Sequence, residues 1–205
     1  MKRPTRVAVF ASGSGSNFQA LTDAVAEGRI PAAQLVLLVT DKPQAAVVDR
    51  AERAGVPVFA FRPRDYASRE AYEAEIVARL TELEVDLIVL AGYMRLVTST
   101  LLTPFAGRIV NIHPSLLPSF PGVDGVRQAI EYGVKVTGVT VHFVDAGLDT
   151  GPVLLQRAVE VLDDDTEETL AARIHAVEHE LYPEAIRLLS EGRVELDGRK
   201  VRLRK

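Results

Sequence analysis

The 205-residue chain contains no cysteine. This absence excludes disulfide bonds, thiol nucleophiles and metal sites built on cysteine ligands. A strong excess of one charge is also missing, because 24 Lys and Arg residues stand against 28 Asp and Glu residues, for a net charge of −4. That balance argues against a broad nucleic-acid-binding surface, although a local basic pocket for a single phosphate is compatible with it.

Long hydrophobic runs are absent as well. No apolar stretch is long enough to span a membrane. The apolar run at residues 7–11, which follows a basic N-terminus, is too short for the core of a signal peptide. We find no internal repeat, low-complexity tract or long linker, so the sequence predicts one domain over residues 1–205, without membrane attachment, in the cytoplasm.

What the chain does contain is an alternation of short β-branched runs with longer helical segments. Strands are expected at residues 6–11, 34–40, 58–61, 85–92, 108–112, 136–144 and 152–161. Helices are expected at 17–26, 44–54, 68–84, 124–132 and 166–190, before a hairpin turn at Asp197-Gly198. This alternation predicts an α/β fold with a mostly parallel sheet and helices on both faces. Ligands of such sheets bind beyond the carboxyl ends of the strands, where the loops 12–17, 92–97 and 113–122 fall.

The first of these loops reads SGSGSN and joins a strand to a helix. Its backbone N–H groups and the helix dipole favour an anion such as phosphate. It is not a Walker A loop, because no Gly-Lys-Ser/Thr follows, and Phe18 occupies the third glycine position of the dinucleotide fingerprint. A tight turn with a Ser or Asn cap explains the loop equally well, so both interpretations stay open.

The second feature is the run Asn111-Ile112-His113-Pro114. Residues two apart on a strand share a face, so Asn111 and His113 are expected to face one pocket while Ile112 packs behind them. An amide donor beside a titratable imidazole suits acyl transfer, since one group supports an oxyanion and the other moves a proton. The alternative is that both side chains merely satisfy loop backbone groups. The adjacent Ser115 has no evident base and is interpreted as loop structure.

The third feature is the loop at residues 145–151, which carries two Asp and two Gly residues. It could form a plain turn or a cation loop, but its spacing lacks the ligand alternation of a calcium-binding loop. A carboxylate from this loop could instead contact His113 and orient its ring. His142 is interpreted as a core or edge histidine. His175 and His179 have metal-capable spacing on one helix, but a surface role is favoured and no metal site is predicted.

Together these motifs resemble the folate-dependent phosphoribosylglycinamide formyltransferases. The resemblance covers residues 6–193 and rests on SGSGSN, AGYMRLV, GRIVNIHPSLLPSFPG, VTGVTVHFVDAGLDTGPVLLQ and EHELYP, which stand in family order. It implies a Rossmann-like formyltransferase fold. It also implies transfer of the formyl group of 10-formyltetrahydrofolate to the amine of glycinamide ribonucleotide in purine biosynthesis, with small-molecule substrates and no nucleic-acid or membrane partner.

The resemblance also implies roles for individual residues. Asn111, His113 and Asp149 correspond to a catalytic trio. The substrate positions, which hold the phosphate and the ribose hydroxyls, are Gly15, Ser16, Asn17 and Glu178. The folate positions are Arg69, Met94, Arg95, Leu96, Val97, Asn111, Val144, Asp145, Ala146, Gly147, Leu148 and Asp149. Arg69 and Arg95 are implied near the acidic tail of the folate, and the bond Leu117–Pro118 is implied to be cis.

One segment departs from the family. After Phe120-Pro121-Gly122 many relatives carry histidines, whereas this chain reads Val123-Asp124-Gly125-Val126. Three other functions were considered. A formyltetrahydrofolate hydrolase is expected to carry an extra N-terminal domain, and a methionyl-tRNA formyltransferase a C-terminal RNA-binding domain. A non-catalytic folate- or nucleotide-binding protein would not need the intact trio.

Overall fold

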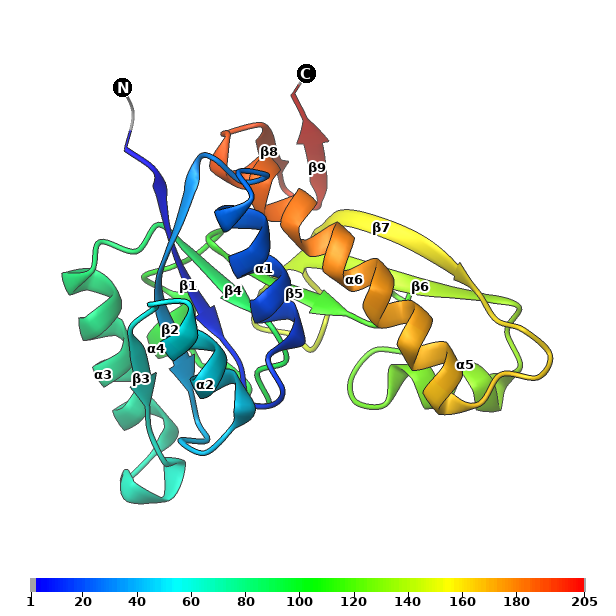
Figure 1. Cartoon of the computed structure of the whole chain (residues 1–205), viewed down its shortest axis with the longest axis horizontal. Coiled ribbons are helices and arrows are strands. Elements are labelled where there is room, and N and C mark those ends of the chain that lie inside the picture. The colour runs from blue at the N-terminus through cyan, green and yellow to red at the C-terminus, as the bar shows by residue number, and fades with distance from the viewer. Residues whose placement is uncertain (1–2, 205) are drawn as a thin grey trace.

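A computed structural model describes residues 3–204 of the chain, so residues 1, 2 and 205 of the expected domain lie outside the described part. Its centre is a seven-stranded sheet in the order β3-β2-β1-β4-β5-β6-β7 (Figure 1). The strands are β1 (Thr5–Phe10), β2 (Ala33–Thr40), β3 (Val58–Ala60), β4 (Leu87–Leu90), β5 (Ile109–His113), β6 (Val136–Phe143) and β7 (Val153–Glu160). The first five pair in parallel, whereas β6 and β7 run antiparallel to their neighbours.

The helices are α1 (Ser16–Ala26), α2 (Ala46–Arg53), α3 (Arg69–Glu82), α4 (Ser99–Leu102), α5 (Gly125–Tyr132) and α6 (Glu167–Ser190), with a 3-10 turn η1 (Pro63–Asp65). A separate hairpin, β8 (Val194–Asp197) with β9 (Lys200–Leu203), follows α6. The expected mostly parallel α/β fold is therefore confirmed.

The two faces of the sheet are sorted by alternation along the strands. In β1, Val7 and Val9 are fully buried beneath α1, α2 and α6, whereas Ala8 and Phe10 are fully buried beneath α3 and α4. Figure 1 shows α1, α2 and α6 in front of the sheet. A strand buried on both faces reads as a continuous apolar run, which is why the sequence pattern located it.

The strand order reverses between β1 and β4, because the chain first builds outward from β1 to β3 and then returns to the other side of β1. Such a reversal leaves a crevice at the carboxyl ends of the two strands. The loops that follow β1 and β4 meet there, and the Ser12 amide donates to the Gly92 carbonyl at 3.0 Å. The sheet therefore brings two of the three expected ligand loops together.

Several predicted boundaries were wrong by a few residues, and two short elements were missed. The strand expected at 85–92 is only Leu87–Leu90, and the helix expected at 44–54 is Ala46–Arg53. The missed elements, η1 and α4, span only three and four residues, too short for a periodic pattern. The caps were easier to find: Ser68 accepts from the Ala71 amide at the start of α3. Among residues 3–204 no helix is long and apolar enough to cross a membrane.

The fully buried Tyr182 links α6 to the sheet. Its hydroxyl donates to the Leu90 carbonyl at 2.7 Å and lies 3.2 Å from the Val110 carbonyl. We expect Tyr182→Phe to lower the free energy of unfolding by about 1–2 kcal/mol, because a buried hydrogen bond is lost without a change of shape. Urea denaturation measures this. Tyr132→Phe, at a 79% exposed position, is the matched control, and an equal loss in both variants would contradict the role given to Tyr182.

Candidate active site

The side chains of Asn111 and His113 share one face of β5. Val110 and Ile112, which alternate with them, are buried in the core cluster on the opposite face. The same-face prediction is therefore confirmed. His113 is only 5% exposed, so its ring is held within the protein and presents a restricted edge to the crevice.

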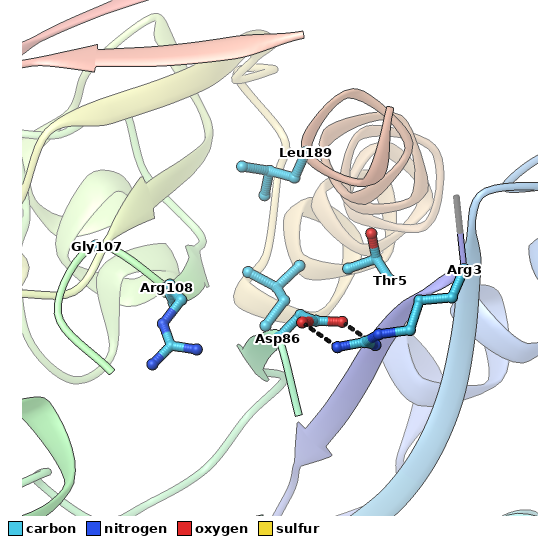
Figure 2. A pocket seen from close by; sticks show the side chains of 7 residues that line it. Arg3, Thr5, Asp86, Gly107, Arg108 and Leu189 are labelled. Carbon is cyan, nitrogen blue, oxygen red and sulfur yellow. Dashed lines mark hydrogen bonds and ion pairs between the residues drawn. The ribbon is translucent and has the colours of Figure 1, made fainter. Parts of the chain in front are cut away.

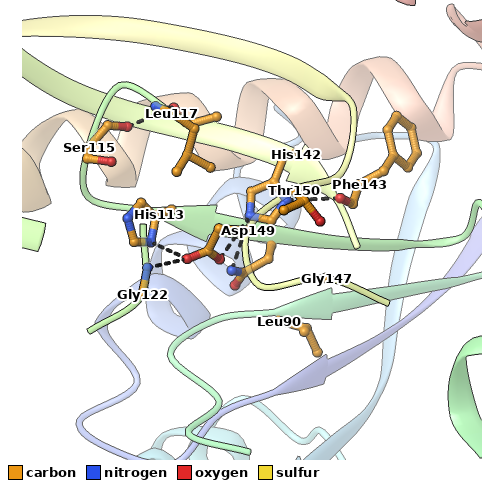
Figure 3. A network of polar contacts seen from close by, with 12 residues as sticks. Leu90, His113, Ser115, Leu117, Gly122, His142, Phe143, Gly147, Asp149 and Thr150 are labelled. Atoms are coloured by element: carbon orange, nitrogen blue, oxygen red, sulfur yellow. Dashed lines mark hydrogen bonds and ion pairs between the residues drawn. The ribbon is translucent and has the colours of Figure 1, made fainter. Parts of the chain in front are cut away.

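Asp149 reaches His113 from the loop between β6 and β7, as Figure 3 shows. Its Oδ2 lies 3.5 Å from His113 Nδ1 and accepts from the Gly122 amide at 2.7 Å. His113 Nε2 lies 2.8 Å from the Phe120 carbonyl oxygen. Both partners of the ring are hydrogen-bond acceptors. The two contacts orient the imidazole, as expected for a carboxylate from this loop.

A second histidine completes the cluster, and the sequence did not reveal it. His142 lies opposite Asn111 in the β5–β6 pairing. Its Nε2 is 3.4 Å from Asn111 Nδ2 and 3.6 Å from Asp149 Oδ1. The expected core position of His142 is confirmed, since it is 2% exposed, and the structure adds contacts with Asn111 and Asp149 that the sequence did not predict. Only the register of two strands distant in sequence could have shown its position.

The hydrogen bonds of His142 indicate which of its ring nitrogens carries the proton. Its Nδ1 donates to its neighbour's carbonyl, Phe143 O, at 2.9 Å, which leaves Nε2 as an acceptor for the Asn111 amide. Burial lowers the pKa of His142 below its ordinary 6.5, and the Asp149 carboxylate opposes this only in part. The neutral form of His142 is therefore favoured beside Asp149.

Polar contacts beneath the site hold the loop at residues 113–122. Thr140 Oγ1 donates to the Ser115 carbonyl at 2.7 Å and accepts from the Leu117 amide at 3.1 Å. Gln156 donates to the Leu117 carbonyl at 2.8 Å. Ser115 Oγ donates to the Ser119 carbonyl at 2.6 Å, in agreement with a structural role for this residue. The peptide bond Leu117–Pro118 is cis, as predicted.

The loop after β1 enters α1 through Gly15, whose φ of 76° lies in the left-handed region. A Cβ at this position would come within 2.5 Å of Val47, so the close approach of α2 also requires glycine. Asn17, in the first turn of α1, donates to Glu178 on α6 at 3.2 Å. The structure thus brings Glu178 next to the loop that carries Gly15, Ser16 and Asn17. Asn17 and Glu178 are 161 residues apart in the sequence.

Glu178 is 4% exposed and also accepts from His175 Nδ1 at 2.8 Å, which raises the pKa of His175. His175 and His179 stack with ring centroids 6.5 Å apart. In the described part of the chain, residues 3–204, no group of three or more His, Asp or Glu side chains is arranged to hold a metal ion.

The loop after β4 exposes apolar side chains at the crevice. Met94 is 66% and Leu96 61% exposed, and Leu148 on the β6–β7 loop is 56% exposed. Val97 and Val144 pack against one core cluster, which joins the two loops at their bases. Arg69 is exposed at the first turn of α3, whereas Arg95 pairs through Nε with Asp41 at 2.8 Å.

A hollow at the opposite, amino-end edge of the sheet contains none of the expected site residues. Figure 2 shows it between Arg3, Asp86 and Arg108. Arg3 donates to both carboxylate oxygens of Asp86, at 2.8 and 3.0 Å, so these opposite charges compensate each other.

A buried carboxylate between two histidines, at the carboxyl edge of a parallel sheet, is an arrangement suited to group transfer with proton movement. The sequence signature described as "Formyl transferase" matches residues 5–186. The chain therefore belongs to the formyl transferase family.

Comparison with individual relatives is more specific than the family signature. The phosphoribosylglycinamide formyltransferase of Bacillus subtilis is 53% identical over 184 residues, which cover 90% of this chain and 94% of the relative. The crystal structure of glycinamide ribonucleotide transformylase 1 from Symbiobacterium toebii is 51% identical, with a TM-score of 0.97 over 100% of this chain and 96% of that one. The expected formyltransferase fold is thus confirmed.

A formyltetrahydrofolate deformylase from Pseudomonas syringae is also similar, at 26% identity and a TM-score of 0.91. The match covers 99% of this chain but 67% of the deformylase. The same fold therefore serves more than one formyl-group enzyme.

The contact between His142 and Asp149 can be tested by NMR spectroscopy. Removing the Asp149 charge by Asp149→Asn should lower the pKa of His142 further, because the carboxylate favours the protonated ring. NMR titration of the histidine ring signals measures this. His175, whose pKa is raised by Glu178, is the internal control and should keep its midpoint. An unchanged or higher midpoint for His142 in the variant would contradict the ionic contact.

Proposed function

We propose that this chain is an enzyme of purine biosynthesis that transfers the formyl group of 10-formyltetrahydrofolate to the amine of glycinamide ribonucleotide. The observation that carries this proposal is the joining of the His113–Asp149 pair to Asn111 in a chain 53% identical to a phosphoribosylglycinamide formyltransferase. We also propose that residues 1–205 form a single domain.

The three catalytic side chains have distinct tasks. The formyl donor supplies an electrophilic carbonyl carbon whose oxygen becomes negatively charged when the amine adds. Asn111 uses one amide hydrogen toward His142 and has a second for this oxygen. His113, held by the Phe120 carbonyl and Asp149, is the imidazole that moves a proton beside the same oxygen, once Nε2 exchanges the Phe120 carbonyl for the substrate.

The proposed transfer needs no metal and no covalent intermediate with the enzyme. A carbon–nitrogen bond forms to the acceptor amine, and the bond from the formyl carbon to the folate nitrogen breaks. The acceptor amine loses one proton and the departing folate nitrogen gains one. Asp149 stabilises the charged His113 during this exchange and offers a carboxylate next to the path of a relay water.

The substrate sites follow from the three loops. Gly15, Ser16 and Asn17 present the start of α1 to the phosphate, and the buried Glu178 accepts ribose hydroxyls. The exposed apolar side chains of Met94, Leu96 and Leu148 fit a flat pterin ring, which needs an apolar slot with backbone hydrogen-bonding groups at its edge. Val97 and the segment 144–149 close this slot, and Arg69 is assigned to the folate tail, whereas Arg95 is paired with Asp41.

Hydrolysis of the same formyl donor is the second candidate, since a deformylase shares the fold. The identity of 53% to a ribonucleotide-formylating relative against 26% to the deformylase favours transfer to the amine. A direct assay separates the two. The purified chain is incubated with 10-formyltetrahydrofolate, with and without glycinamide ribonucleotide. Formyl-ribonucleotide formation is expected, whereas tetrahydrofolate release at the same rate without the ribonucleotide would overturn the proposal.

The catalytic role of Asp149 is tested by Asp149→Asn. Its φ of 54° is one that Asn also tolerates, so the variant keeps the backbone and loses the charge. Turnover should fall by at least ~10²-fold with little change in unfolding free energy. Asp163→Asn, at an exposed ion pair with Lys135, is the matched control. Near-normal turnover in the Asp149 variant would exclude the proposed role.

The role of Arg69 is tested with tailed and tailless ligands. At an exposed rim an Arg–carboxylate contact is modest, so Arg69→Ala should weaken tetrahydrofolate binding by about tenfold or less, and less still at high salt. Binding of tetrahydropteroate, which lacks the glutamate, should not change. Arg64→Ala, an arginine side chain that is 80% exposed, is the control. Equal weakening of both ligands would show that Arg69 does not bind the tail.

A further inference from the structure

A carboxylate that has no role in the proposed chemistry lies at the junction of the two substrate loops. Asp41 directly follows β2, and its side chain is fully buried. Ser12 Oγ donates to Asp41 Oδ1 at 2.5 Å, and Arg95 Nε donates to Asp41 Oδ2 at 2.8 Å. Ser12 Oγ in turn accepts from the Met94 amide at 2.9 Å. One carboxylate thus joins the loops that follow β1, β2 and β4.

The charge of Asp41 has one close cationic partner in the described chain, Arg95. A buried carboxylate is costly unless it is paired and hydrogen-bonded, so its two oxygens constrain both Ser12 and Arg95. Arg95 is half-exposed, with 39% of its side chain accessible, yet its guanidinium is directed inward by this pair. The contact also raises the pKa of Arg95, as expected for a cation beside a carboxylate.

A second buried carboxylate holds the other end of the same loop. Glu73 on α3 is 2% exposed and accepts from the Thr98 amide at 2.9 Å and from Thr98 Oγ1 at 2.5 Å. The main chain at 94–98 is therefore fixed at both ends from within the protein. This explains how Met94 and Leu96 remain exposed at the crevice without collapsing onto the core.

We propose that Asp41 is a positioning residue that shapes the folate slot through Arg95 and Ser12, and that the charge of Arg95 serves this ion pair instead of the glutamate tail. The inference rests on the proposed function of the loop at 94–97. Because Ser12 opens the loop that leads to Gly15, Asp41 also sets where the folate slot lies relative to the phosphate loop.

The test uses the full chain and measures binding of tetrahydrofolate and tetrahydropteroate by calorimetry. Asp41→Asn keeps size and acceptor oxygen but removes the charge. We expect both ligands to bind about tenfold more weakly, with a matching rise in the KM for the folate and a smaller change in the KM for the ribonucleotide. Asp49→Asn, at an exposed position of α2, is the matched control and should bind both ligands as wild type does.

Arg95 variants make the proposal falsifiable even if Asp41→Asn folds poorly. Arg95→Ala should weaken the binding of both ligands equally, in contrast to Arg69→Ala. Arg95→Lys should bind both ligands almost as tightly as the wild type, because it keeps the charge. The double variant Asp41→Asn/Arg95→Ala should be no worse than the poorer single variant, since the two residues act as one pair. If Arg95→Ala weakened the binding of tetrahydrofolate alone, the proposal would be overturned and Arg95 would be a tail-binding residue. Wild-type binding of both ligands by Asp41→Asn would also overturn the proposal.

These measurements are separable from the proposed function. If the wild-type chain binds tetrahydrofolate but does not formylate glycinamide ribonucleotide, the acceptor is wrong while the binding comparison still decides the role of Asp41. If the wild type formylates the ribonucleotide and the Asp41 variants bind normally, only the positioning role fails.

Discussion

Parallel pairing of β1 with both β2 and β4 is the constraint on which the rest of the structure depends. Parallel strands leave the sheet at the same edge, so the three loops that follow them must meet there. The backbone bond from Ser12 to Gly92 is the first contact across that meeting point. Because the sheet is buried on both faces by two separate core clusters, the edge is also the place where polar side chains can gather.

The polar groups at this edge divide into two kinds. Asp41 and Glu73 are buried carboxylates whose partners are loop residues, and they fix the main chain from inside. Asp149 is also largely buried, but its partners include two imidazoles and it comes from a loop in which residues 145–148 are exposed. Asp41 and Glu73 thus hold the loops in place, while Asp149 joins the titratable side chains of the candidate site.

His113 and His142 have different hydrogen-bonding environments within this cluster. His113 faces two acceptors, a carbonyl and a carboxylate, whereas His142 donates to one carbonyl and accepts from an amide. The same residue type therefore has two different sets of hydrogen-bond partners beside one carboxylate. The deformylase shares this fold at 26% identity, so the fold alone does not define the reaction.

The sequence by itself determined the alternation of strands and helices, the shared face of Asn111 and His113, the start of a helix at Ser68, and the family. These are local properties, set by periodicity and short motifs. It missed His142 because the residue faces Asn111 only through the antiparallel register of β5 and β6, which no local pattern specifies. It missed Asp41 because the partner, Arg95, is 54 residues away and the two meet only when β2 and β4 flank β1. Tertiary structure alone decided these contacts, since strand order and register bring together side chains that are unrelated along the chain.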